Sequence, residues 1–282
     1  MSAFAWVMNL DADFELARRG YSTPAKLAAD LLRHGGAARA LLGEGDVLIG
    51  GALAGEAIAN PSRYLGRAFC PTQKAIAIMR RAGVEPEAHP DEAVLRRVNH
   101  RRFACALGGG LREQRYVETR AELEAALAGG PKLLKRPLAF AGRGQLRVSG
   151  ALGEKDDAWI AASLREDGLV VEPLVTPSLE VSVHGFVTKD GACALGRICV
   201  QATNGRGVFR SARLADRADL RTDEARALLI AAERTAAALR DTGYFGPFGI
   251  DGYRYERGFC ALSEINARYT MAFAIGFGQG QS

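Results

Sequence analysis

Two strand-like segments near the C-terminus, residues 248–255 and 259–268, narrow the possible folds of this chain more than any other part of its sequence. In the second segment Glu264, Asn266 and Arg268 lie two residues apart, so their side chains project from one face of a strand. The residues between them are apolar and face the other side. The pattern predicts a β-hairpin with one buried face and one face that carries a row of polar groups.

Two carboxylates are expected to face each other across this hairpin. With a two-residue turn at residues 257–258, Asp251 on the first strand lies directly opposite Glu264. Like charges in this relation destabilise a sheet by up to about 1 kcal/mol, unless a cation lies between their oxygens. With Asn266 as a third oxygen ligand, the set predicts a Mg²⁺ or Mn²⁺ site. The alternative is an ordinary solvent-exposed edge hairpin.

A candidate phosphate site lies in residues 131–145. Lys135, at the end of a predicted strand, supplies a compact charge suited to phosphate oxygens, and the loop with Gly142 and Gly144 can bring main-chain N–H groups onto the same phosphates. The segment is not a P-loop, because no G-K-[ST] follows. A plain hairpin turn is the alternative. Further along, a predicted buried strand ends at Glu172.

The N-terminal third of the chain alternates strand and helix signals. Residues 6–10 and 46–50 are predicted strands, and residues 25–42 and 73–81 are predicted helices. This alternation is typical of a small doubly wound sheet. The acidic pair Asp11 and Asp13 is interpreted as a solvated strand end, and a metal or phosphatase motif is the alternative.

The composition of the chain shifts near residues 87–95. After this shift the strand pattern is typical of antiparallel sheets. We therefore predict an α/β chain whose second part is α+β. Helices are predicted over residues 92–107 and about 223–240. Strands are predicted at residues 133–136, 145–148, 169–171 and 179–188.

The composition of the chain argues against several classes of function. The chain has 37 basic and 32 acidic residues, but the arginines form no stripe or tail, so we expect no nucleic acid partner. No apolar run reaches the roughly 18 residues that a membrane helix needs. The 5 cysteines are scattered without a C-x-x-C pair, which argues against zinc and for reduced thiols in the cytoplasm. The first basic residue is Arg18, so we expect no signal peptide.

Taken in order, these features resemble the ATP-grasp superfamily from about Asn99 to the C-terminus, and the preceding region resembles the small Rossmann-like domain found in front of it. The resemblance implies a pre-ATP-grasp domain at residues 1–94 and an ATP-grasp domain at residues 95–282. Two α+β subdomains would clasp ATP, a nucleotide-clasping one at about 110–172 and a metal-binding one at about 173–282.

The resemblance also implies roles for individual residues. Asp251, Glu264 and Asn266 correspond to the ligands of two Mg²⁺ ions that bridge the ATP phosphates. Lys135 corresponds to the lysine that contacts the α- and β-phosphates, and residues 138–144 to a mobile glycine flap, which we call the flap. The adenine and ribose contacts would be the Leu174 N–H with Glu172 beside the amino group, and Glu180 on the ribose hydroxyls.

The sequence departs from the family in two places. The second phosphate-contacting lysine is missing, so Arg101 would have to replace it. The chain stops soon after Arg268, so we expect the acceptor end of the site to be open, or completed by a partner or a second copy in a homodimer. Arg210 matches a basic residue that the family often places facing the transferring phosphate, and a charged loop is the alternative.

Arg268 shares a strand face with the candidate metal ligands and lies roughly 6–7 Å beyond them. Its planar guanidinium suits a carboxylate or an acyl phosphate, so we predict that it contacts the acceptor. The alternative is a surface arginine that pairs with an exposed acid.

The resemblance implies an ADP-forming carboxylate–amine ligase, or a carboxylate–thiol ligase, with small-molecule substrates. Its carboxylate would attack the γ-phosphate of Mg-ATP, and the nucleophile would then displace phosphate from the acyl phosphate. Arg268, Arg210 and Lys135 are the predicted catalytic residues. Two alternatives remain, an ATP-grasp phosphotransferase that acts on a hydroxyl and a non-catalytic ATP-binding accessory subunit.

Overall fold

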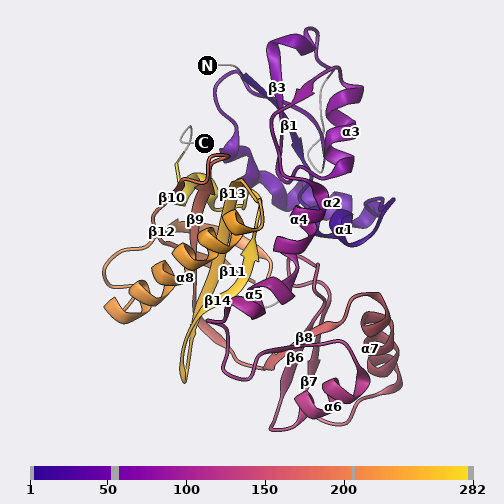
Figure 1. The fold of residues 1–282 in the computed structure, drawn as a ribbon, viewed down its shortest axis with the longest axis vertical. Helices are drawn as coiled ribbons and strands as arrows, with labels where there is room; N and C mark the ends of the chain where they lie inside the picture. Colours follow the sequence, from indigo (N-terminus) through magenta and orange to yellow (C-terminus); the bar gives the residue numbers. More distant parts are fainter. Residues whose placement is uncertain (1–2, 52–56, 205–206, 279–282) are drawn as a thin grey trace.

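The computed structural model describes residues 3–51, 57–204 and 207–278, which form three β-sheets with helices packed on them (Figure 1). The N-terminal sheet, sheet A, is parallel and has the strand order β2-β1-β3-β4. Its strands are β1 (Ala3–Met8), β2 (Val47–Gly51), β3 (Tyr64–Ala68) and β4 (Glu85–Pro86). Its helical segments are α1 (Ala12–Ala17), α2 (Ala25–His34), η1 (Gly35–Leu41), η2 (Pro61–Arg63) and α3 (Gln73–Arg81). The predicted alternation of strands and helices is confirmed, although the helix expected at 25–42 becomes a 3₁₀ turn after His34.

The single helix expected over residues 92–107 is broken at His100. This residue is extended, with φ −72° and ψ 126°, and its Nδ1 accepts a hydrogen bond from the Arg102 N–H at 3.1 Å. The Arg101 N–H donates to the Pro137 carbonyl, 3.1 Å away, instead of to the preceding helix. The two segments are α4 (Glu92–Asn99) and α5 (Arg101–Leu107). The break therefore ties the start of α5 to the loop that contains the flap.

Sheet B is antiparallel, with the order β5-β8-β6-β7. Its strands are β5 (Arg115–Val117), β6 (Lys132–Lys135), β7 (Gln145–Val148) and β8 (Leu169–Pro173), and its helices are α6 (Arg120–Leu127) and α7 (Glu154–Glu166). Leu134 packs with Leu123 of α6 and Ile160 of α7. Because strand side chains alternate, Lys135 points to the opposite face, away from these helices. Glu172 lies on that same face, since it is the cross-strand neighbour of Leu133.

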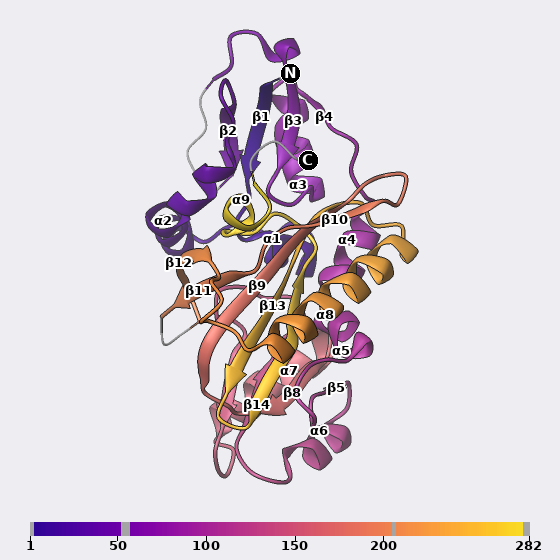
Figure 2. The same cartoon turned by 90° about the vertical axis from the view of Figure 1, so that its left-hand side faces the viewer.

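Sheet C has the order β12-β11-β9-β13-β14, and β10 pairs with β9. Its strands are β9 (Pro177–Val187), β10 (Cys193–Leu195), β11 (Cys199–Thr203), β12 (Phe209–Leu214), β13 (Gly246–Tyr255) and β14 (Gly258–Asn266). The long helix α8 (Thr222–Asp241) crosses one face of the sheet, and the short α9 (Phe273–Gly276) follows β14 (Figure 2). Val183, Ile250 and Ile265 are buried with Leu228 of α8 in one core.

The other face of sheet C carries polar side chains. Gln201 is the cross-strand neighbour of Glu180, and Asp251 is that of both Ser182 and Glu264. Cross-strand neighbours lie on one face, as do residues two apart on one strand. Glu180, Gln201, Asp251, Glu264 and Asn266 therefore share the face opposite α8.

The predicted facing of Asp251 and Glu264 is confirmed, but the predicted turn is wrong by one residue. Tyr255 pairs with Gly258, so the turn is formed by residues 256–257. A β-bulge beside Asp251 makes up the difference in register. The two carboxylates thus meet through a combination of turn and bulge that pattern alone does not reveal.

Sheet A shares a hydrophobic core with the end of the chain. Trp6 and Phe69 are buried in one cluster with Phe140 of the flap, Tyr269 and Phe273. The ring centroids of Trp6 and Tyr269 are 5.1 Å apart. This packing brings the segments that follow β1 and β3 next to the segment that follows β14. Within the described residues, no helix combines the length and apolar character that a membrane crossing requires.

Candidate active site

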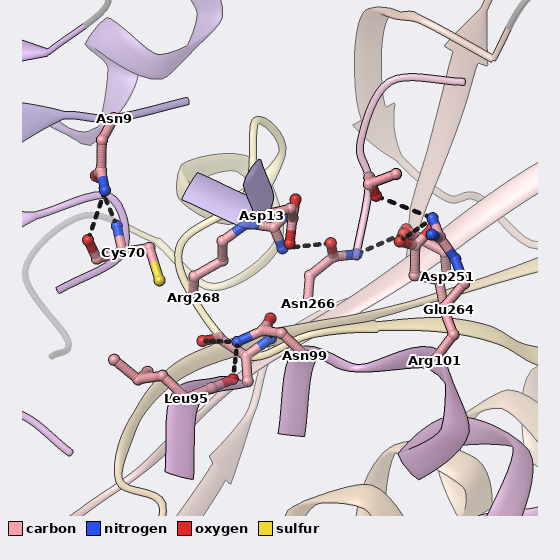
Figure 3. Close-up of polar contacts among 12 residues, drawn as sticks. Asn9, Asp13, Cys70, Leu95, Asn99, Arg101, Asp251, Glu264, Asn266 and Arg268 are labelled. Atoms are coloured by element: carbon pink, nitrogen blue, oxygen red, sulfur yellow. Dashed lines mark hydrogen bonds and ion pairs between the residues drawn. The ribbon is translucent and has the colours of Figure 1, made fainter. Parts of the chain in front are cut away.

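The centre of the candidate site is the pair Asp251 and Glu264 with Asn266 beside them (Figure 3). Asp251 accepts two hydrogen bonds, from the Gln201 Nε2 at 2.9 Å and from the Asn266 Nδ2 at 2.8 Å. Desolvation and the nearby Glu264 carboxylate raise the pKa of Asp251 to about 7. Because its surroundings disfavour the charged form of Asp251, a cation bound beside this carboxylate would stabilise it.

The donor set fits a hard divalent cation. Two carboxylates and an amide oxygen are the ligands that Mg²⁺ accepts, with water and phosphate oxygens completing its six positions. No group of three or more His, Cys, Asp or Glu side chains in the described part of the chain could hold a metal ion by itself. The protein ligands would therefore be Asp251, Glu264 and Asn266, with the remainder supplied by the nucleotide.

Arg268 is buried, not at the surface, and it joins two parts of the chain. One guanidinium nitrogen donates to Asp13 of α1 at 2.6 Å, and the other donates to the Asn266 Oδ1. The interpretation of Asp13 as a solvated strand end is wrong, because this residue is only 4% exposed. Desolvation raises the pKa of Asp13, against the opposing effect of Arg268.

Asn99 holds the backbone on which these groups sit. Its Oδ1 accepts a hydrogen bond from the Ala267 N–H at 2.8 Å, and its Nδ2 donates to the Ala267 carbonyl at 3.3 Å. Ala267 lies between Asn266 and Arg268, so the contact fixes where both side chains begin. Asn99 stands directly before the break at His100, and no local sequence pattern predicts its role.

Arg101 links the flap to the candidate metal site. It donates to the Glu264 Oε1 at 2.7 Å and to the carbonyls of Arg136 and Ala139, at 2.5 and 3.0 Å. The side chain is 5% exposed, and its Nε has no hydrogen-bond partner among the described residues. Arg101 therefore contacts a candidate metal ligand, and its contact with the ATP phosphates stays a prediction.

The flap itself depends on glycine at two points. Gly142 and Gly144 have positive φ angles of 70° and 65°. A Cβ at Gly144 would lie 2.8 Å from the Ala139 Cβ, so a larger residue would push the loop open. The Gly144 carbonyl accepts from the Arg136 N–H at 2.8 Å, which closes the loop at its base.

Lys135 is held by a carboxylate from the neighbouring strand. Its Nζ lies 2.6 Å from the Glu172 Oε1, and Gln114 donates to the other Glu172 oxygen at 3.1 Å. The side chains of Lys135 and Glu172 are 10% and 4% exposed. Glu172 therefore compensates the charge of the lysine.

We expect Lys135→Ala to weaken nucleotide binding and to slow turnover by roughly tenfold or more, because one charge-assisted phosphate contact is lost. It should also cost about 3 kcal/mol of stability, since Glu172 is left buried with only Gln114 as its partner. Lys132→Ala is the matched control, because this lysine lies on the opposite face of β6 and pairs with Glu113. Urea unfolding and steady-state ADP formation measure both variants; nucleotide affinity that falls equally in both would contradict the assignment.

The prediction for the Leu174 N–H needs correction. This group donates to the Pro131 carbonyl at 2.9 Å, where it extends the pairing of β8 with β6. It is not free to bind an adenine ring. Val175 is the next residue along, and its N–H forms no hydrogen bond with the residues that the structure describes. A main-chain contact with adenine would therefore lie one residue further along the chain than predicted.

Two further predicted residues, Glu180 and Arg210, lie on strands of sheet C. Glu180 lies on the polar face of sheet C with the candidate metal ligands. Arg210 is exposed and does not line the cavity described below, whereas its neighbour Phe209 does. Alternation along β12 explains the difference, since adjacent side chains point to opposite faces.

A cavity of about 260 Å³ opens beside the candidate metal ligands. Arg101, Asp251, Glu264, Asn266 and Arg268 all line it, together with Gly142 of the flap. The segments that follow β1 and β3 contribute Leu10 and Phe69, for which the sequence gives no signal of a place in the site. The cavity is thus formed where sheet C, the flap and the N-terminal region meet.

Comparison with solved structures identifies the fold. D-alanyl-alanine synthetase A from Vibrio cholerae superposes with a TM-score of 0.57 at 14% identity, covering 99% of this chain and 92% of that one. VanG D-Ala:D-Ser ligase from Enterococcus faecalis gives 0.56 at 15% identity, covering 99% and 97%. N5-carboxyaminoimidazole synthetase from Staphylococcus aureus, complexed with ADP, gives 0.53 at 11% identity, covering 77% and 61%. The chain thus spans less than two thirds of the length of the Staphylococcus enzyme.

The chain has the ATP-grasp fold, as the sequence resemblance implied. Sheet A precedes sheets B and C along the chain. No protein-family model and no curated protein matches the sequence. At such low identities the likeness concerns the fold, and the reaction must be argued from this chain's own residues.

Proposed function

We propose that this protein is an ADP-forming ligase that activates a carboxylate with ATP and joins it to an amine or a thiol. The observation that carries the proposal is the facing of Asp251 and Glu264 beside Asn266 and Arg268, at a cavity in an ATP-grasp fold. Like charges in this relation are unfavourable unless cations compensate both of them, and Arg101 pairs only with Glu264. Their presence at a cavity favours a catalyst over an accessory subunit that only binds nucleotide.

Asp251, Glu264 and Asn266 would hold Mg²⁺, and we propose two ions. When bound, the metal neutralises phosphate charge as it builds up during transfer. Lys135 would bind the α- and β-phosphates. Val175 takes the adenine-directed role first given to Leu174, with Glu172 and Glu180 near the base and the ribose.

The reaction depends on alignment of the reactants and on exclusion of water more than on covalent catalysis by the protein. A carboxylate oxygen attacks the γ-phosphorus of ATP, the bond to the β-phosphate oxygen breaks, and ADP leaves with that electron pair. The amine or thiol then attacks the acyl carbon and releases phosphate. Arg268 orients the carboxylate, and Arg101 links the flap to the metal site so that closure and nucleotide binding are coupled.

We propose a division at residue 94, with sheet A before it and sheets B and C after it, although the hydrophobic cluster around Trp6 crosses that boundary. The substrates would be small molecules, and a second copy could complete the acceptor end. All five cysteines lie among the described residues and are free thiols, which supports a cytoplasmic location.

ADP formation with a panel of acids, against a panel of sugars and polyols, tests the reaction class. Hydroxylamine in the assay converts an acyl phosphate into a hydroxamate, which is detected directly. We expect hydroxamate to form with at least one acid and only when ATP and Mg²⁺ are present. ADP formation with a polyol, and none with any acid, would assign the protein to the phosphotransferases instead.

A further inference from the structure

A buried histidine connects the interior of sheet C to the cavity beside the candidate metal ligands. His184 of β9 is 1% exposed, and each of its ring nitrogens lies next to a hydroxyl. The Nε2 is 3.0 Å from the Ser182 Oγ, and the Nδ1 is 3.1 Å from the Thr270 Oγ1. Ser182 is fully buried, whereas Thr270 is half-buried and lines the cavity. The imidazole therefore stands between a hydroxyl in the protein interior and a hydroxyl that a ligand can reach.

The imidazole ring is held in one orientation by its neighbours. Gly249 of β13 is the cross-strand neighbour of His184, and a Cβ on this glycine would lie 2.9 Å from the His184 Nδ1. A Cβ on Gly276 of α9 would lie 2.6 Å from the His184 Cδ2. The Phe273 ring lies edge-on to the imidazole, with the ring centroids 6.1 Å apart. Because two backbone segments approach the ring this closely, it has no room to turn, and each nitrogen keeps its hydroxyl partner.

The imidazole is neutral in this setting. Its hydrogen-bond partners among the described residues are two uncharged hydroxyls, and burial lowers the pKa of His184 to about 3. A neutral imidazole carries one proton on its nitrogens, so one nitrogen donates a hydrogen bond and the other accepts one. Two arrangements of the protons are therefore possible, and they differ in which hydroxyl accepts the hydrogen bond from the ring.

The buried hydroxyl selects one of these two arrangements. Ser182 makes no other side-chain hydrogen bond with the described residues, so its proton gains a partner only by donation to the His184 Nε2. In the opposite arrangement this proton would be buried without an acceptor, which carries a free-energy cost that folded proteins rarely bear. With the Nε2 as acceptor, the ring proton lies on the Nδ1 and is donated to the Thr270 Oγ1. The Thr270 proton is then not used by the ring and is available to a ligand in the cavity.

We infer, on the basis of the proposed ligase function, that Thr270 donates a hydrogen bond to an anionic oxygen in the cavity, and that His184 and Ser182 are positioning residues that fix its hydroxyl as a donor. A hydroxyl that accepts one hydrogen bond becomes a stronger donor of the next. Arg268 lies two residues before Thr270 and lines the same cavity, so a charged group and a neutral donor can bind one anion together. The anionic oxygen belongs to the carboxylate of the acid or to the γ-phosphoryl group of ATP.

The position of the ring proton can be measured without any assay of activity. Nitrogen NMR of protein with isotopically labelled histidine distinguishes a protonated ring nitrogen from an unprotonated one. The chain has 4 histidines, and replacing each of the other three by glutamine in turn identifies the His184 signals by elimination. We expect a protonated Nδ1 and an unprotonated Nε2, unchanged between about pH 5 and 8 because the ring stays neutral. A proton on the Nε2, or a second proton gained in this range, would overturn the inference whatever the protein catalyses.

Thr270→Val removes the hydroxyl and keeps the shape of the side chain. We expect kcat/KM for hydroxamate formation to fall by roughly tenfold or more, because a hydrogen bond to a charged oxygen is lost, whereas Thr270→Ser should keep most of the activity. A higher KM for the acid assigns the contact to the carboxylate, and a higher KM for ATP assigns it to the phosphoryl group. A lower kcat with both KM values unchanged means that the contact forms in the transition state.

Thr235→Val is the matched control for this variant. Thr235 is also a buried threonine, but it lies on α8, on the other face of sheet C, and its hydroxyl has no hydrogen-bond partner among the described residues. We expect its kinetics to equal those of the wild type. Activity of Thr270→Val that also equals that of the wild type would overturn the contact with the anionic oxygen.

Ser182→Ala tests the positioning role, because Ser182 is not among the described residues that line the cavity. Without its hydroxyl nothing selects the position of the ring proton, so the NMR signals should show a mixture and Thr270 should partly turn to donate to the ring. We expect kcat/KM to fall about threefold in the wild-type background and to stay unchanged in the Thr270→Val background. Equal losses in both backgrounds, with the ring proton still on the Nδ1, would reduce Ser182 to a structural role and overturn this part of the inference.

The outcomes separate the inference from the function on which it rests. Hydroxamate from no acid, with ADP formed from polyols, rejects the ligase and the contact with a carboxylate. The NMR experiment still decides whether Thr270 is fixed as a donor, because it needs neither substrate nor turnover.

Discussion

Glu264→Gln should abolish most of the stabilisation that Mg-ATP gives to this protein. At a nucleotide concentration about 100 times the dissociation constant, binding stabilises the native state by about 2.7 kcal/mol, a readily measured rise in the unfolding temperature. The amide cannot neutralise a divalent cation as the carboxylate does. Differential scanning fluorimetry with Mg-ATP, with ATP and EDTA, and with no ligand measures the effect.

Without ligand, the same change should alter stability only slightly. It removes the repulsion between residue 264 and Asp251, but it also replaces the ion pair with Arg101 by a neutral hydrogen bond. These effects oppose each other, and the amide oxygen can still accept a hydrogen bond from Arg101, so we expect a net change well below the roughly 3–5 kcal/mol that an unpaired buried charge costs. Glu256→Gln, in the exposed turn of the same hairpin, is the matched control and should keep the full response. If Glu264→Gln is stabilised by Mg-ATP as much as the wild type, the metal assignment is wrong.

The sequence predicts the polar hairpin because side chains along a β-strand alternate between its two faces. Glu264, Asn266 and Arg268 must share a face wherever the strand lies, and the structure brings Asp251 opposite Glu264. The turn was misplaced because Gly258 invites a turn, whereas here it pairs with Tyr255. Local periodicity is thus a better guide to which residues share a face than to where a turn begins.

The parts that were not predicted depend on contacts between distant segments. Asp13 meets Arg268 across 255 positions of sequence, and Asn99 meets Ala267 across 168. No local pattern reports such pairs, because they arise only when sheet A packs on the end of β14. The hydrogen bond of the Leu174 N–H was missed for a related reason, since it belongs to the pairing of β8 with β6.

The ion pair between Arg268 and Asp13 gives the arginine a structural role as well as its proposed catalytic one. Both side chains are buried, 8% and 5% exposed, and they join α1 to the segment after β14. Removing one member of a buried pair leaves the other charged and uncompensated, at a cost of about 3–5 kcal/mol. We therefore expect Arg268→Ala to lower the free energy of unfolding by about that amount.

The double variant with Asp13→Asn should recover part of the loss, since no isolated charge remains. A double-mutant cycle by urea unfolding measures the coupling between the two residues. Additive effects would mean that the two side chains do not interact in solution. Asp13→Asn alone keeps Arg268 and its contact with Asn266, so it should lose stability while it retains acceptor-dependent turnover.

Arg268→Lys separates the catalytic role from the structural one. An ammonium can retain the charge opposite Asp13, but it lacks the planar fork that reaches Asn266 and a substrate carboxylate together. We expect nearly unchanged stabilisation by Mg-ATP and a loss of acceptor-dependent ADP formation of about 100-fold, or about 2.7 kcal/mol of transition-state stabilisation. If nucleotide affinity falls in parallel with turnover, Arg268 serves the nucleotide. If Arg268→Lys is as active as the wild type, the arginine only joins α1 to sheet C, and the carboxylate must be oriented by another group in the cavity.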